Sequence, residues 1–171
     1  MVKFLGAILV VGASGIIGNV IARGYADRPK QLLELVTAFT LLETEISYTK
    51  TPLSDALIRA SGRKGSVAQK IFETASDIIA CGTQGSGQAW ESAIDCVYSI
   101  SALTPEDRHI LLVFGAKLGS CSSRDQLKHI TLVRERLRAN EVKARDKVNE
   151  IARMWRCLGL TIGIMIVLLL Y

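Results

Sequence analysis

Aromatic residues, prolines and histidines are scarce in this sequence of 171 residues: aromatics make up 6%, and there are 3 prolines and 2 histidines. The 4 cysteines, at positions 81, 96, 121 and 157, form no CxxC pair, so the ligand spacing typical of zinc sites is missing. We therefore expect no metal site and interpret the cysteines as buried, reduced thiols. Neither His109 nor His129 lies in a recognisable catalytic signature, and there is no GxxxxGK phosphate-binding loop. The residue pattern thus predicts no catalytic residues, no cofactor and no enzyme.

Charged residues are missing from one stretch at each end of the chain, Phe4–Ala22 and Cys157–Tyr171. As helices these stretches would be about 28 Å and about 22 Å long, and the first is close to the hydrocarbon thickness of a bilayer. We predict an N-terminal transmembrane helix in residues 1–23 and a C-terminal one in residues 154–171, both in contact with membrane lipid. Two alternatives stay open: a cleaved signal peptide ending near Ala13, and a buried C-terminal core helix.

Basic residues flank both uncharged stretches. Arg23, Arg28 and Lys30 follow the first stretch, and Arg153 and Arg156 precede the second. By the positive-inside rule, the middle domain, residues 24–153, is cytoplasmic and both termini point outward. These flanking charges contribute to the net charge of +5, and no clustered basic face with interleaved aromatics accompanies them. We therefore expect no nucleic-acid partner.

The segment Ile8–Gly18 has the strand, glycine-rich turn and helix-start pattern with which short-chain dehydrogenases bind a dinucleotide. That fold needs a second strand with an acidic residue about 20 residues later, but Gln31–Tyr48 has helical spacing instead. No Tyr stands four residues before a Lys, and no alternation of strands and helices follows. A membrane-bound, short-chain dehydrogenase-like NAD(P) protein is one alternative function, and a generic membrane-anchored adaptor is another.

Apolar residues between Gly24 and Arg153 recur with helical spacing, and no stretch there has the pattern of a strand. The pattern predicts an all-α fold, a membrane-anchored six-helix bundle whose last helix continues into the C-terminal transmembrane helix. The first helix has an apolar stripe at Leu32, Leu35, Val36, Phe39, Leu42 and Ile46. We expect the second helix to have Thr51 as its N-cap and Pro52 as its first residue, and the third and fourth helices to have Ser66 and Ser86 as their N-caps. The fifth helix should have Thr104 as its N-cap, followed by Pro105, and the sixth should begin near Arg124. The inward stripe of the sixth helix is Ile130, Val133, Leu137, Ala144, Val148, Ile151 and Trp155.

Seven short motifs occur in an order that is specific as a set, although each is weak alone. They are Arg28-Pro29, Leu41–Tyr48, Thr51–Leu53, Ala89-Trp90, Gly115–Gly119, Asp125–Ile130 and Met154–Gly159. With these motifs the chain resembles, end to end, the stage III sporulation protein AB family of endospore-forming bacteria. Its middle domain also resembles the cytoplasmic domain of the F-type platform proteins of type II secretion and type IV pilus machines. Those proteins carry the domain twice with three spans, whereas here it occurs once between two.

The resemblance implies a non-enzymatic scaffold subunit of the channel complex between mother cell and forespore. It implies a place in the mother-cell membrane, with the helical domain in the cytoplasm. The implied partners are a cytoplasmic secretion-type ATPase and other channel subunits, and homo-oligomerisation stays open. The candidate partner-binding residues are Glu43, Glu45, Tyr48, Asp125, Gln126 and Lys128, for which the alternative role is capping and bonding within the bundle.

Overall fold

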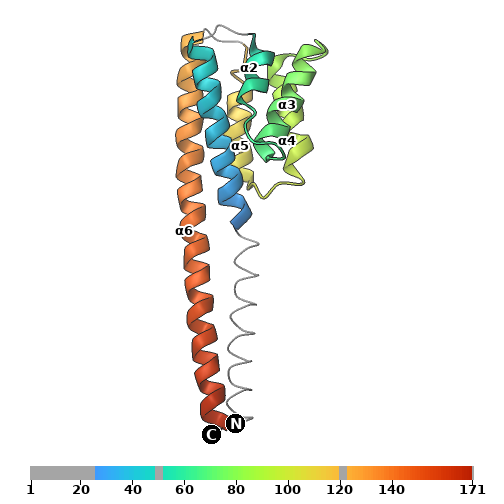
Figure 1. The fold of residues 1–171 in the computed structure, drawn as a ribbon. Helices are drawn as coiled ribbons and strands as arrows, with labels where there is room; N and C mark the ends of the chain where they lie inside the picture. Colours follow the sequence, from blue (N-terminus) through green and yellow to red (C-terminus); the bar gives the residue numbers. More distant parts are fainter. Residues whose placement is uncertain (1–25, 49–51, 120–122, 171) are drawn as a thin grey trace. The chain divides into compact units, whose positions relative to one another are not determined.

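The computed structural model describes residues 26–48, 52–119 and 123–170, and all regular structure in these ranges is helical. Within these ranges the all-α prediction and the six predicted bundle helices are confirmed. Figure 1 draws these helices as coiled ribbons. The helices are residues 26–48, α2 (Leu53–Ala60), α3 (Val67–Ala80), α4 (Ser86–Tyr98), α5 (Pro105–Gly115) and α6 (Ser123–Leu170). Because these ranges contain no strand, this part of the chain holds no parallel sheet of the kind that a dinucleotide-binding fold requires.

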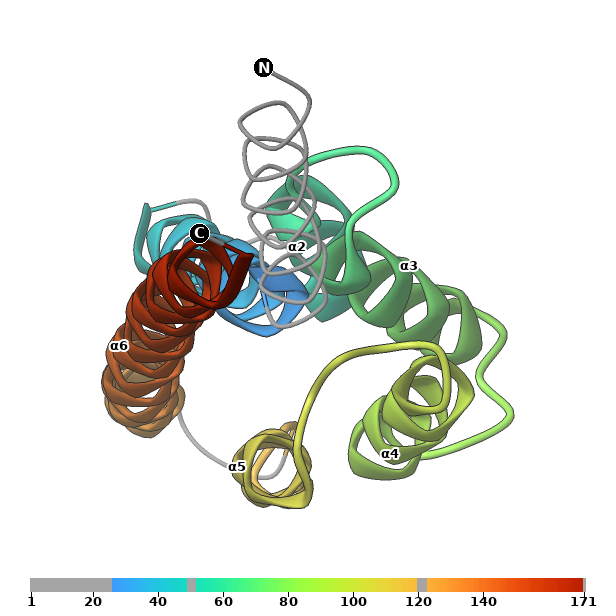
Figure 2. The ribbon, with the colours of Figure 1, turned by 90° about the horizontal axis from the view of Figure 1, so that it is seen from below.

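The chain divides into two compact units. One, Arg28–Val142, is the helical unit; the other contains the part of α6 from Lys143 onward. Within the helical unit, α2 packs on α3, α3 on α4 and α4 on α5 (Figure 2). Residues 26–48 run antiparallel to the first turns of α6 (Figure 1).

Two of the predicted helix starts have the predicted chemistry. The Ser66 hydroxyl accepts a hydrogen bond from the backbone N–H of Gln69 at 3.0 Å and so caps α3. Thr104 caps α5, Pro105 is the first helical residue, and Asp107 closes a reciprocal capping box.

Two other helix starts differ from the prediction. Pro52 is the N-cap of α2 rather than its first residue, and Thr51, the predicted cap, lies outside the described residues. Ser86 is the first residue of α4, and Gly85 stands at the cap. The Ser86 hydroxyl donates instead to the carbonyl of Leu118, just beyond the end of α5, at 2.8 Å. The hydroxyl therefore makes a tertiary contact and not the local capping bond that we predicted.

Four aromatic rings from four helices form the centre of the core. Phe39, Phe72, Trp90 and Phe114 meet edge to face, with ring centroids 5.1 to 6.1 Å apart. All four side chains are buried, and the Trp90 indole N–H donates to the carbonyl of Leu111 at 2.9 Å. These four aromatic side chains thus lie where burial contributes most to stability.

Glycine allows α4 and α5 to cross closely beside this core. A Cβ on Gly115 would lie 2.5 Å from the Trp90 ring, and a Cβ on Gly87 would lie 2.9 Å from the carbonyl oxygen of Gly115. Only hydrogen atoms fit at both positions, and this fixes the spacing of the two helices.

The predicted apolar stripes are buried or half-buried wherever the structure describes them. Of the stripe on residues 26–48, all members are buried except Ile46, which is half-buried. On α6, Ile130, Val133, Leu137 and Ala144 are buried, while Val148 and Ile151 are half-buried. The side chain of Trp155 lies outside the description.

In the described part of the chain, no helix combines the length and the apolar character needed to cross a membrane. The predicted N-terminal span, residues 1–23, and the glycine-rich segment within it lie outside the described residues. The predicted C-terminal span, residues 154–171, falls on the end of α6, where most side chains are not described.

Candidate functional site

A buried carboxylate, Asp107, is the centre of a polar network in the helical unit. Its side chain is 0% exposed. The Arg28 guanidinium donates to it twice, from Nε to Oδ2 at 2.9 Å and from Nη2 to Oδ1 at 3.2 Å. Thr104 donates to Oδ2 from its backbone N–H at 3.0 Å and from its hydroxyl at 2.8 Å, and Asn140 Nδ2 donates to Oδ1 at 2.8 Å.

These bonds determine the charge state of the carboxyl group. Burial by itself raises the pKa of Asp107, but the hydrogen bonds from Arg28, Thr104 and Asn140 together outweigh it and hold the pKa below its ordinary value. The group is therefore a stable anion at neutral pH. Both carboxylate oxygens accept hydrogen bonds from these partners, so neither is left for proton transfer. The network instead links residues 26–48, the start of α5 and the middle of α6.

A second polar cluster joins the other end of residues 26–48 to α6. The Thr131 hydroxyl donates to Glu43 Oε1 at 2.9 Å, and Arg134 forms an ion pair with the same carboxylate. Glu43, a predicted partner-binding residue, is therefore bonded within the bundle, as the alternative interpretation held. The candidate residues of this end nevertheless come together, because the antiparallel pairing brings residues 43–48 beside the start of α6.

The other candidates at this end range from half-buried to exposed. Glu45 forms a long ion pair of 3.9 Å with Arg59 of α2, and Tyr48 is 84% exposed. Lys128 forms an exposed pair of 3.6 Å with Asp125, and Gln126 is half-buried. The structure thus gathers the candidate residues on one end of the helical unit, where Tyr48, Asp125 and Lys128 are exposed to solvent. Glu43, Glu45 and Gln126 are half-buried.

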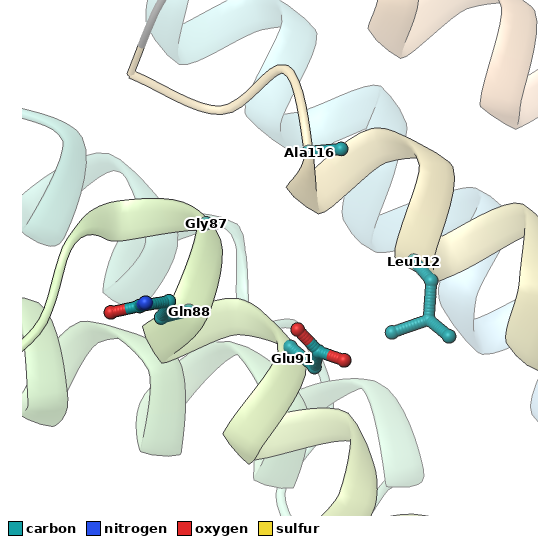
Figure 3. A pocket seen from close by; sticks show the side chains of 5 residues that line it. All are labelled: Gly87, Gln88, Glu91, Leu112 and Ala116. Carbon is teal, nitrogen blue, oxygen red and sulfur yellow. The ribbon is translucent and has the colours of Figure 1, made fainter.

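A cavity of about 360 Å³ lies between α4 and α5 (Figure 3). Its lining contains one carboxylate, Glu91, which faces Leu112 across the cavity. General acid–base chemistry on a substrate usually needs two groups that titrate differently, and no second titratable group is among the lining residues. The cavity therefore has the character of a surface groove between helices. Its lining residues are Gly87, Gln88, Glu91, Leu112 and Ala116.

The prediction of buried cysteines is wrong where it can be checked. Cys81, Cys96 and Cys157 are exposed, because they stand after the end of α3 or on outward faces of their helices; Cys121 lies outside the described residues. Among the residues that the structure describes, no group of His, Cys, Asp and Glu side chains is arranged to hold a metal ion. Sequence analysis identified Thr104 and Pro105 as a helix start but did not pair Asp107 with Arg28 or Asn140, which lie 79 and 33 residues away in the chain.

Comparison with known proteins gives consistent matches. A family model described as "Stage III sporulation protein AB" matches residues 3–171. The stage III sporulation protein AB of Bacillus subtilis (strain 168) is 32% identical over 170 residues, which is 99% of each chain. A solved structure of a stage III sporulation protein AB is 30% identical and superposes with a TM-score of 0.65, covering 72% of this chain and 97% of that one. The sequence matches extend over nearly the whole length and the fold match over 72% of this chain, and the chain belongs to the stage III sporulation protein AB family.

Proposed function

We propose that this protein is a membrane-anchored, non-enzymatic platform subunit of the channel complex between mother cell and forespore during endospore formation. In this proposal the uncharged ends of the chain, in residues 1–23 and 154–171, anchor it in the mother-cell membrane. The helical bundle lies in the cytoplasm and organises a secretion-type ATPase and other channel subunits. The observation that carries the proposal is the family match over residues 3–171, which includes both uncharged ends as well as the bundle.

The chemistry of the helical unit suits a scaffold. The buried Asp107 has all of its lone pairs directed at partners in the bundle, and Glu43 is bonded to Thr131 and Arg134. Buried polar groups bonded in this way hold helices in fixed positions, which is what an assembly surface requires. We propose that the surface for the ATPase is the end of the bundle that carries Glu43, Glu45, Tyr48, Asp125, Gln126 and Lys128.

The anchoring part of this function can be tested with the native cysteines. Cys81 and Cys96 are exposed on the folded helical unit, so a thiol reagent that reaches this side of the membrane will react with them. We expect an impermeant maleimide to label both only after the cells are opened, and alkaline carbonate to leave the chain in the membrane pellet. Denatured samples control for reagent access. Labelling of Cys81 or Cys96 in intact cells would place the helical unit outside and contradict the proposal.

A further inference from the structure

The loop between α4 and α5, residues 99–104, carries the most exposed aliphatic side chain among the described residues of the helical unit. Ile100 is 64% exposed, whereas Leu103 in the same loop is buried and holds the loop on the core. No charged residue occurs from Cys96 to Pro105. One exposed aliphatic residue needs no explanation by itself. What distinguishes Ile100 is the backbone around it and the place of its loop in the chain.

The backbone of this loop makes few demands on water. All five N–H groups from Ile100 to Thr104 donate to acceptors within the protein. Because an N–H group that loses water without gaining an acceptor is costly to bury, a loop bonded in this way can enter a poorly hydrated environment at low cost. The acceptors are, in order, the carbonyls of Val97 and Tyr98, Gln31 Oε1, the Ser101 hydroxyl and Asp107 Oδ2, at 3.2, 3.1, 2.8, 3.4 and 3.0 Å.

Two hydrogen bonds fix the loop beside the beginning of residues 26–48. The backbone N–H of Ala102 donates to Gln31, and the Thr104 hydroxyl accepts from Arg28 Nη2 at 3.1 Å. Figure 1 shows the α4–α5 connection and the beginning of residues 26–48 at the same end of the helical unit. Arg28 stands five residues after residue 23, the end of the predicted N-terminal span, and five residues extend at most about 17 Å. If residues 1–23 span a bilayer, the chain itself therefore keeps this loop close to the lipid.

The charged groups around the loop favour neither an acidic nor a basic partner. Asp95, just before the loop, forms an ion pair of 2.6 Å with Arg108, just after it. Lys30, Asp27 and Glu106 are exposed, differ in sign, and stand next in sequence to residues that hold the loop. What the loop offers a partner is thus an aliphatic side chain and not a charge.

We propose that the α4–α5 loop lies on the bilayer surface, with Ile100 inserted at the boundary between the lipid headgroups and the acyl chains. This inference rests on the proposed membrane anchoring of residues 1–23 and 154–171. One aliphatic side chain is too small to hold a protein on a membrane, so the contact orients the helical unit and the terminal segments anchor it.

Quenching by labelled lipid tests the contact in the full chain. In a background without the native thiols, Ser99→Cys, an exposed position beside Ile100, carries a nitrobenzoxadiazole label in phosphatidylcholine nanodiscs. Lipid with a doxyl group near the headgroup end of its acyl chain should lower the emission about two-fold or more, because the label then lies at the same depth as the quencher. The control chain retains only Cys81, which is exposed and is separated from the loop by the 13 residues of α4, a length of about 20 Å. Emission from the label on Cys81 should stay unchanged.

Substitutions at position 100 show whether the isoleucine side chain makes the contact. Ile100→Leu, made in the Ser99→Cys chain, keeps an aliphatic group and should keep the quenching. Ile100→Glu adds a charge that is costly to remove from water and should reduce the quenching to that of the Cys81 chain. Because the side chain is largely exposed, both variants should retain the circular dichroism of the parent.

The outcomes separate this inference from the proposed anchoring. Equal quenching at Ser99→Cys and Cys81, in a chain that alkaline carbonate leaves in the membrane, would overturn the loop contact and leave the anchoring intact. Quenching that Ile100→Glu does not reduce would overturn the insertion of Ile100. Release of the chain by carbonate would overturn the anchoring and, with it, the loop contact.

Discussion

Replacing Asp107 with alanine is expected to lower the free energy of unfolding by about 3–5 kcal/mol, because the change leaves a half-buried guanidinium and a buried amide without their shared partner. Arg28 and Asn140 both donate to this carboxylate, and they belong to different helices. Thermal unfolding of the full chain in mild detergent, followed by circular dichroism, should show the melting temperature falling by about 10 °C or more. Asp125→Ala, which removes an exposed pair 3.6 Å long, should change stability by less than about 1 kcal/mol.

The same network predicts how stability depends on pH. The pKa of Asp107 is lowered in the folded chain, so its contribution is present above the unfolded pKa of about 3.9 and is lost as pH falls through the folded value. Asp107→Asn cannot ionise, so the stability difference between this variant and the wild type should be largest near neutral pH and should shrink below about pH 4. A difference that stays constant from pH 7 to pH 3 would contradict the assigned charge state.

Replacing Trp90 with alanine is expected to cost about 3–5 kcal/mol, the usual range for removing a large aromatic side chain from a packed core. Trp90 is 0% exposed, meets the rings of Phe39, Phe72 and Phe114, and donates to the carbonyl of Leu111.

Two further variants separate packing from hydrogen bonding at this site. Trp90→Phe keeps an aromatic ring and removes the indole N–H, so it should cost less than the alanine variant. Ile100→Ala changes a side chain that is 64% exposed and should stay within about 0.5 kcal/mol of the wild type. Equal losses for Trp90→Ala and Ile100→Ala would show that the aromatic cluster is not the centre of the core.

The features of the fold that depend on residues close together in the sequence could be predicted from the sequence. The apolar stripe from Leu32 to Leu42 has helical spacing, and Thr104-Pro105 combines a cap with the residue best suited to the first helical position. Ser86 shows where such reasoning stops, because its hydroxyl has two uses, a local cap and a bond to Leu118, and only the tertiary structure determines which one forms.

Pairing across the chain could not be predicted in this way. Sequence periodicity shows that Arg28, Asp107 and Asn140 lie on helices, but it does not show which charged group meets which, since the partners lie far apart in the chain. Thr37, Thr40 and Thr44 read as polar surface residues until the structure shows their hydroxyls bonded to the helix backbone.

The role of a platform subunit is tested most directly by recovering the complex from sporulating cells. The tagged full chain would be purified from detergent-solubilised membranes, and the secretion-type ATPase that accompanies it would be quantified. Lys128→Glu on the proposed partner surface is compared with Lys70→Glu, the same charge change at an exposed position on α3. We predict that the ATPase is recovered with the wild type and with Lys70→Glu, and that recovery falls at least ten-fold with Lys128→Glu. A folded, membrane-bound wild-type chain that brings down no ATPase would contradict the platform function.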